Sequence, residues 1–133
     1  MTGALKSKKQ TTTARVLIVD DEPDIVNIIQ CHLESCKCEV ITATNGVEGL
    51  EKAAKEKPDL ILLDINMPTM NGLQMLERLK KHPELKDIPV IMSTVICEPQ
   101  DIAVASSYGI ADYITKPFEL SELAGKITKV LNL

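Results

Sequence analysis

The chain contains 133 residues, of which 44% are hydrophobic and 26% are charged, a composition typical of one soluble globular domain. Its net charge of −4 argues mildly against a nucleic-acid-binding protein, and no apolar run approaches the ~20 residues of a membrane span. Because no segment has the composition of a targeting signal, we expect a cytoplasmic protein that contacts neither nucleic acid nor a membrane directly. Residues 1–14 are rich in Thr and Lys without periodicity, which predicts a flexible N-terminal tail before a domain over residues 15–133.

After Arg15, short apolar runs alternate with amphipathic stretches. Continuous apolar runs of four or five residues are typical of strands buried on both faces. In chain order, the first predicted elements are a strand over Val16–Val19, a helix that starts at Asp21-Glu22-Pro23, a strand over Glu39–Ala43, a turn at Asn45-Gly46 and a helix from Val47 to Lys57. A strand over Leu60–Leu63, a loop from Ile65 to Gly72 and a helix that ends before Pro83 follow. The last elements are a strand over Val90–Met92, a helix from Pro99 to about Ser107, a strand over Ala111–Ile114 and a helix that contains Leu120 and Val130.

Apolar residues at helical spacing predict which face of a helix packs on the core. The residues predicted to face inward are Ile25, Ile28, Ile29 and Leu33 in the first helix and Val47, Leu50 and Ala54 in the second. Strands that alternate with helices predict an α/β protein, with five helices on the two faces of a five-stranded parallel sheet.

The four cysteines do not indicate a disulfide framework or a zinc protein. Cys36 and Cys38 stand two apart in a predicted turn, whereas Cys31 and Cys97 are expected to be small buried hydrophobic residues. Zinc and redox sites usually combine two closely spaced Cys or His pairs, and only fragments of that pattern occur here. Reduced thiols in a reducing compartment are therefore favoured.

Polar side chains stand where the predicted strands end. Asp20 and Asp21 follow the first strand, Asp64 the third, Thr94 the fourth and Lys116 the fifth. The carboxyl ends of parallel strands meet at one edge of the sheet, and ligands of open α/β sheets bind at that edge. The sequence therefore predicts that these five residues converge in space.

The chemistry of these five residues is that of phosphoryl transfer. Carboxylates brought together repel one another, and a hard cation with oxygen ligands, Mg²⁺ or Mn²⁺, relieves that repulsion. The ammonium of Lys116 and the hydroxyl of Thr94 suit phosphoryl oxygens. A carboxylate such as Asp64 can be the nucleophile that accepts the phosphoryl group.

Taken together, these segments resemble the response-regulator receiver family of two-component signalling, and in length the chemotaxis-type members. The resemblance covers nearly the whole chain from Arg15, and its specificity comes from the order and spacing of the pieces. It implies a flavodoxin-like, doubly wound sheet with strand order 2-1-3-4-5. The segments that carry it are Asp20-Asp21-Glu22-Pro23, Leu63-Asp64-Ile65-Asn66-Met67-Pro68 with Asn71-Gly72, Ser93-Thr94, and Tyr113-Ile114-Thr115-Lys116-Pro117-Phe118.

The resemblance also implies a metal site and a phosphorylation site. Asp64 would accept a phosphoryl group from a histidine kinase or a histidine phosphotransfer protein. Asp21 would bind the metal directly and Asp20 mainly through water, while Asp64 and the backbone carbonyl of Asn66 would complete the protein ligands. Lys116 would bridge Asp64 and the phosphoryl group.

The same resemblance implies a switch rather than an enzyme, apart from assistance to the domain's own phosphorylation and dephosphorylation. Thr94 would move inward to bond the phosphoryl group, and Tyr113 would swing inward with it. Lys116 and Pro117 would be joined by a cis peptide bond. A downstream protein effector would bind at roughly Pro99–Leu133.

Each residue also has a simpler interpretation. Asp20 and Asp21 could be helix N-cap residues, Thr94 and Lys116 an ordinary strand-end threonine and a solvated lysine, and Tyr113 a strand-packing residue. Because all of these residues fit one phosphorylation site, the functional interpretation is favoured over the separate simpler ones.

Three other functions are alternatives to a phosphorylated receiver. A haloacid-dehalogenase-type phosphatase resembles Asp-x-Asp-x-Thr, but the residues after Asp64 are Ile65 and Asn66, so the second Asp is missing. A flavodoxin-like FMN carrier would need a loop rich in glycine and hydroxyl groups after the first strand, where acidic residues stand instead. A degenerate receiver, an interaction module that is never phosphorylated, is the main alternative, although no key residue is missing.

Two positions depart from the family pattern. Val95 stands where a small residue is usual, and its branched side chain is expected to narrow the donor entrance. Ile96 stands where a polar residue often orients the attacking water. We expect Ile96→Glu to shorten the half-life of the phosphorylated protein, measured from the decay of the phosphoprotein mass; an unchanged half-life would contradict a role in excluding water.

Overall fold

The fold is described from a computed structural model that covers residues 13–67, 70–95 and 99–132. Most of the predicted tail lies outside the described residues, as do Pro68, Ile96 and Cys97. The boundary at residue 15 therefore stays a prediction.

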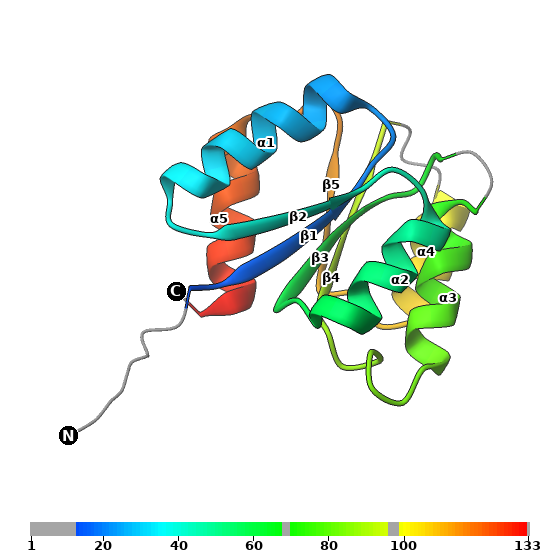
Figure 1. The fold of residues 1–133 in the computed structure, drawn as a ribbon. Coiled ribbons are helices and arrows are strands. Elements are labelled where there is room, and N and C mark those ends of the chain that lie inside the picture. Colours follow the sequence, from blue (N-terminus) through cyan, green and yellow to red (C-terminus); the bar gives the residue numbers. More distant parts are fainter. Residues whose placement is uncertain (1–12, 68–69, 96–98, 133) are drawn as a thin grey trace.

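Five parallel strands form one sheet with the order β2-β1-β3-β4-β5, as predicted (Figure 1). Each predicted strand is present, with ends shifted by at most two residues. The strands are β1 Arg15–Val19, β2 Glu39–Ala43, β3 Leu60–Asp64, β4 Val90–Thr94 and β5 Asp112–Thr115. Their register brings Asp64 opposite Ser93 and Thr94 opposite Thr115, so the strands finish together along one edge.

Helices α1 and α5 cover one face of the sheet, and α2, α3 and α4 cover the other (Figure 1). The helices are α1 Pro23–Ser35, α2 Gly46–Glu56, α3 Gly72–Lys81, α4 Pro99–Ser107 and α5 Leu120–Leu131. Alternate residues of each central strand enter opposite core clusters: Leu17 and Val19 pack under α2 and α3, whereas Val16 and Ile18 pack under α1 and α5. Among the described residues, no helix is long and apolar enough to cross a membrane.

Two predicted inward faces were partly wrong. In α1, Ile28 is 55% exposed, while Val26 is buried in its place. In α2, Val47 and Ala54 are exposed, and the buried residues are Gly46, Gly49 and Ala53. The fully buried residues of α2 are thus all small, which hydrophobicity alone does not reveal. Leu50 is partly buried and packs on the core, as predicted.

The predicted turn at Asn45-Gly46 is instead the start of α2. The side chain of Asn45 accepts a hydrogen bond from the Glu48 N–H at 2.9 Å, and Gly46 is already helical.

The prediction for the cysteines was also partly wrong. Cys31 is exposed on α1 rather than buried. Cys38 is buried under α1, where burial raises the pKa of its thiol, whereas Cys36 is exposed at the end of the helix. In the part of the chain that the structure describes, no cysteine belongs to a group of potential metal ligands.

Helix α3 begins directly behind the end of β3. Asn71 and Gln74 form a reciprocal capping box at its first turn. The N–H of Gly72 donates to the Ile65 carbonyl at 2.9 Å, and a Cβ atom on Gly72 would clash with the carbonyl oxygen of Asp64. Only glycine lets the helix approach the strand end this closely.

We expect Gly72→Ala to lower the free energy of unfolding by about 1–3 kcal/mol, because the methyl group overpacks against backbone atoms that cannot move aside. Gly125→Ala is the matched control, since Gly125 is exposed in α5 with open space around its Cβ position, and it should stabilise by about 0.5–1 kcal/mol. Urea unfolding measures both. Equal effects of the two substitutions would contradict the close approach.

Candidate functional site

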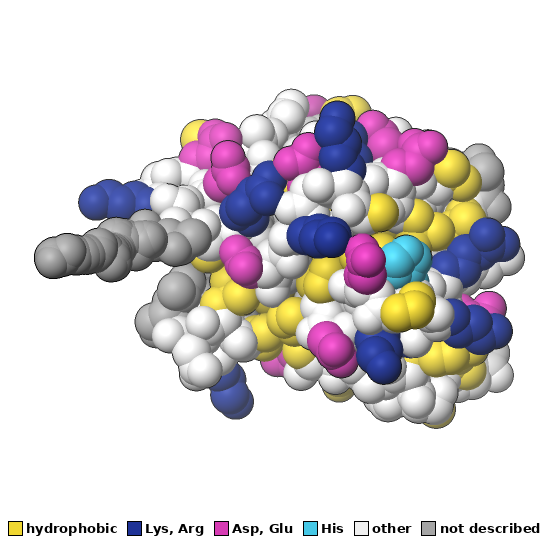
Figure 2. Space-filling model, turned by 60° about the horizontal axis from the view of Figure 1, so that its bottom comes forward, with side chains coloured by type: hydrophobic (Ala, Val, Ile, Leu, Met, Phe, Trp, Pro, Cys, Tyr) yellow, Lys and Arg dark blue, Asp and Glu magenta, His cyan; other side chains and the backbone are white. Residues whose placement is uncertain are grey.

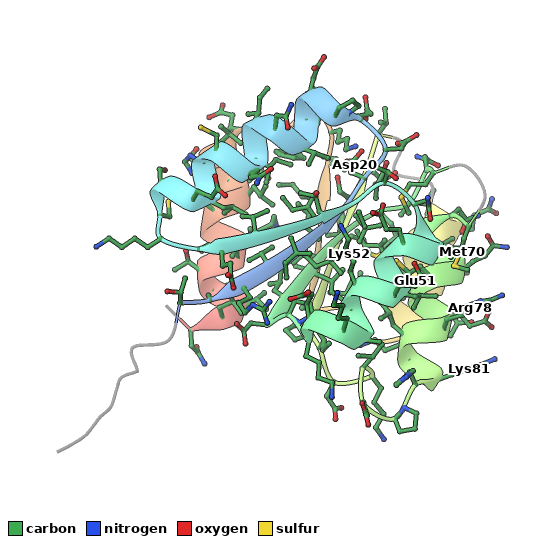
Figure 3. All side chains as sticks on the ribbon, in the orientation of Figure 1. Asp20, Glu51, Lys52, Met70, Arg78 and Lys81 are labelled. Carbon is green, nitrogen blue, oxygen red and sulfur yellow. The ribbon has the colours of Figure 1, made fainter. Side chains whose placement is uncertain are left out.

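Four of the predicted site residues are buried together at the carboxyl edge of the sheet. Asp20, Asp64, Thr94 and Lys116 are 2–8% exposed, and Asp20 lies just beyond the end of β1 (Figure 3). Asp21 is exposed beside them. The predicted convergence of strand-end residues is therefore confirmed.

Backbone hydrogen bonds extend the sheet into the site and hold these residues in place. The N–H of Asp20 donates to the Ala43 carbonyl at 3.0 Å, and the N–H of Lys116 donates to the Thr94 carbonyl at 2.7 Å. The carboxylate of Asp64 accepts a hydrogen bond at 3.1 Å from the N–H of Asn66. The side chains thus project from positions that the sheet register determines.

Lys116 is the cation of the site, and three acids surround its ammonium. Its Nζ atom lies 2.8 Å from Asp20 Oδ2, 3.0 Å from Glu22 Oε1 and 3.6 Å from Asp64 Oδ2. The contact with Glu22 was not predicted, because the sequence indicates Glu22 only as part of a helix-start signal and of the family-like segment, without a role in the site. Its position directly after two aspartates was the available signal.

The electrostatics of the site are dominated by burial. The pKa of Asp64 is raised to about 6, mainly by burial and then by the nearby charge of Asp20, with a smaller contribution from Asp21. The charge of Lys116 and the hydrogen bond from the Asn66 N–H act in the opposite direction. Burial also acts to lower the pKa of Lys116, but its hydrogen bonds with Asp20 and Glu22 outweigh this, so that pKa is raised. Lys116 and the Asn66 N–H therefore offset only part of the cost of an ionised carboxylate at Asp64.

The three aspartates have the arrangement of a cation site. One carboxylate oxygen from each of Asp20, Asp21 and Asp64 lies within 4.8 Å of the others. Oxygen ligands from carboxylates suit Mg²⁺, and a cation there would offset the repulsion that raises the pKa of Asp64. The residues present therefore fit the metal that the receiver family generally binds at an acidic pocket.

Comparison with known proteins decides the family. The family model of the response regulator receiver domain matches residues 16–128 of this chain. The chain belongs to this family. Protein PilH of Pseudomonas aeruginosa is 40% identical over 118 residues, which cover 89% of this chain and 98% of PilH. The crystal structure of chemotaxis protein CheY4 of Vibrio cholerae superposes with a TM-score of 0.86 at 32% identity, over 90% of this chain and 100% of that one.

Longer proteins match this receiver domain over part of their length. The alkaline phosphatase synthesis transcriptional regulatory protein PhoP of Bacillus subtilis is 38% identical over 117 residues, which are 88% of this chain and 48% of PhoP. The chain spans about half the length of several curated relatives that it matches. Membership of the receiver family argues against the phosphatase and FMN-carrier alternatives.

The remaining predicted residues of the receiver domain lie around this centre. Asn66 is exposed two residues beyond the end of β3, and Tyr113 is 41% exposed on β5, the strand next to the one that ends at Thr94. The Lys116-Pro117 peptide bond is cis, as the resemblance implied. Val95 is 57% exposed next to Thr94. Neither Asp20 nor Asp21 is the N-cap residue of α1, since Glu22 holds that position.

An apolar groove opens beside Lys116, between α1 and the start of α5. Its walls are Ile25, Ile28, Ile29, Pro117, Phe118 and Leu120. The side chain of Ile28, 55% exposed, forms part of one wall of this groove.

The raised pKa of Asp64 predicts a pH-dependent stability. Below about pH 4 the carboxyl is protonated in both folded and unfolded chains, so the native state's preference for the neutral group is fully present. As the pH rises through about 6, the folded protein must ionise a buried carboxyl, and that stabilisation is lost.

In metal-free buffer, Asp64→Asn should therefore raise the free energy of unfolding by about 1–3 kcal/mol at pH 7.5 and change it little at pH 4. Asp87→Asn, at an exposed position in the loop after α3, should change it little at either pH. Urea unfolding at the two pH values measures the difference; a gain from Asp64→Asn that is equal at pH 4 and 7.5 would count against the buried charge as its source.

Proposed function

We propose that this receiver domain accepts a phosphoryl group on Asp64 and thereby switches a partner-binding surface. The observation that carries the proposal is the buried Asp64 carboxylate, with its oxygen 3.6 Å from Lys116 Nζ and within 4.8 Å of the aspartate pair. Nucleophilic attack by Asp64 forms an O–P bond while the N–P bond of a donor phosphohistidine breaks, and the histidine nitrogen leaves with the electron pair.

The proposed metal ligands are Asp20, Asp21, Asp64 and the backbone carbonyl of Asn66. When bound there, Mg²⁺ (or Mn²⁺) supplies positive charge that offsets the charge of the carboxylates and of the phosphoryl oxygens. Asp20 already shares its carboxylate with Lys116, so this residue links the proposed metal position to the cation of the site.

Lys116 and Thr94 stabilise the phosphoryl oxygens in this proposal. The ammonium of Lys116 is buried and held by acids on both sides, which keeps it beside Asp64. The carboxyl edge of the sheet, where these residues lie, is called the reacting edge below. The hydroxyl group of Thr94 is at the end of the adjacent strand, from which it can turn toward a phosphoryl group on Asp64. The same groups would assist dephosphorylation by water.

The phosphoryl donor is a histidine kinase or a histidine phosphotransfer protein in this proposal. The apolar groove beside Lys116 supports a protein donor, since its exposed Ile28 offers contact area next to the reacting edge. The effector surface is proposed at Pro99–Leu133, where Tyr113 and Val104 are exposed. Movement of Tyr113 with Thr94 would change this surface.

Contact with nucleic acid is not supported by the charge distribution on the face seen in Figure 2, where lysine and arginine side chains are interspersed with acidic ones. Several relatives are named as transcriptional regulators, and this chain matches about half of their length. Absence of direct nucleic-acid contact and a cytoplasmic location therefore stay predictions.

Intact mass after incubation with acetyl phosphate tests the proposal. The wild type should gain one phosphoryl group when Mg²⁺ is present and none when it is removed with a chelator. Asp64→Asn should gain none, because an amide cannot attack phosphorus in this way, whereas Asp87→Asn should behave as the wild type. A wild type that binds Mg²⁺ but gains no phosphoryl group would favour the phosphorylation-independent interaction module.

A further inference from the structure

Glu22 occupies the N-cap position of α1, but its side chain makes no capping hydrogen bond. Its backbone is held on both sides, since its N–H donates to Asp20 Oδ1 at 2.9 Å and its carbonyl accepts from the Val26 N–H at 3.0 Å. Its carboxylate instead contacts Lys116 Nζ at 3.0 Å. A residue that begins the helix therefore contributes a charge to the reacting edge.

The ammonium of Lys116 is closer to Asp20 and Glu22 than to Asp64, at 2.8 and 3.0 Å against 3.6 Å. Lys116 is 6% exposed in its side chain, whereas the side chain of Glu22 is 52% exposed. Glu22 thus reaches a buried cation from the solvent side. In the part of the chain that the structure describes, Lys116 is the one ion-pair partner of this carboxylate.

We propose that Glu22 is a positioning residue that competes with Asp64 and the incoming phosphoryl group for Lys116, and so slows phosphoryl transfer. The inference rests on the proposed function. With acetyl phosphate as donor, the Asp64 O–P bond forms, the P–O bond to the acetyl group breaks, and acetate leaves with the electron pair. Lys116 stabilises the phosphoryl oxygens in that step only after it has moved away from Glu22.

The exposure of Glu22 sets the size of the effect. An ion pair with one half-exposed member is worth little in water, so its loss should change a rate by roughly two- to five-fold rather than by orders of magnitude. The direction is an acceleration, because removal of the competing carboxylate leaves Lys116 to its two buried partners.

Three substitutions distinguish an effect of the contact between Glu22 and Lys116 from an effect of the net charge of the protein. Glu22→Gln removes the charge at nearly constant size. Glu22→Asp keeps the charge but is shorter by one methylene, so from a fixed backbone it cannot keep the 3.0 Å contact with Lys116. Asp24→Asn removes an exposed acid two residues further along the same helix, without a contact to Lys116.

The time course of phosphoryl gain, followed by intact mass with acetyl phosphate and saturating Mg²⁺, is the first measurement. Glu22→Gln and Glu22→Asp should both react roughly two- to five-fold faster than the wild type, and Asp24→Asn at the wild-type rate. Equal rates for wild type and Glu22→Gln would overturn the proposal. So would an acceleration that Asp24→Asn shares or that Glu22→Asp lacks, since either result indicates repulsion of the anionic donor by net charge.

A second measurement does not depend on phosphoryl transfer. The ¹⁵N–¹H resonance of the Lys116 ammonium, assigned by its loss in Lys116→Arg, should shift in metal-free Glu22→Gln and not in Asp24→Asn. An unshifted resonance would overturn the contact itself. If the resonance shifts but the wild type gains no phosphoryl group at all, the proposed function fails, and the competition fails with it.

Discussion

An excess of carboxylates beside one ammonium, at a buried edge of the sheet, is the constraint on which the rest of this structure depends. Asp64 ends a strand that is buried along its whole length, and burial is the largest cause of its raised pKa. Charges that leave water lose more solvation energy than a partial partner returns. The site therefore favours a bound cation, whose positive charge would let Asp64 stay ionised, and the proposed phosphoryl transfer needs the ionised carboxylate as its nucleophile.

The opposite edge of the sheet shows how the same chain handles charge where no chemistry is proposed. Arg15 pairs with Glu39 and with Glu56 at 2.6 Å each, and its backbone N–H donates to Asp59. These groups are exposed or half-buried, so water completes their solvation. They tie β1 to its neighbours without leaving a buried charge short of partners, which is the usual arrangement in a stable protein.

The reacting edge also limits how the backbone can be built. Helix α3 begins so close to Asp64 that Gly72 admits no side chain, and the capping box of Asn71 sets the direction of the helix. The proposed nucleophile Asp64 is thus supported by backbone rather than by flexible side chains. The cation is held differently, because three side-chain carboxylates lie within 4 Å of the Lys116 ammonium.

The sequence by itself determined the fold class, the strand order implied by the resemblance, and the residues that meet at the reacting edge. This was possible because parallel strands end at one edge, so Asp20, Asp64, Thr94 and Lys116 could be placed from the strand pattern alone. The cis peptide bond before Pro117 followed from the same resemblance.

Only the tertiary structure decided which acids Lys116 contacts, how strongly the pKa of Asp64 is raised, and that Ile28 and Cys31 face solvent. These properties depend on distances and burial among segments far apart in the chain: Asp20 and Lys116 are 96 residues apart and 2.8 Å from each other. Local patterns of hydrophobicity and motif spacing show which residues approach an edge, but the separation of their atoms is set by how the helices pack around that edge.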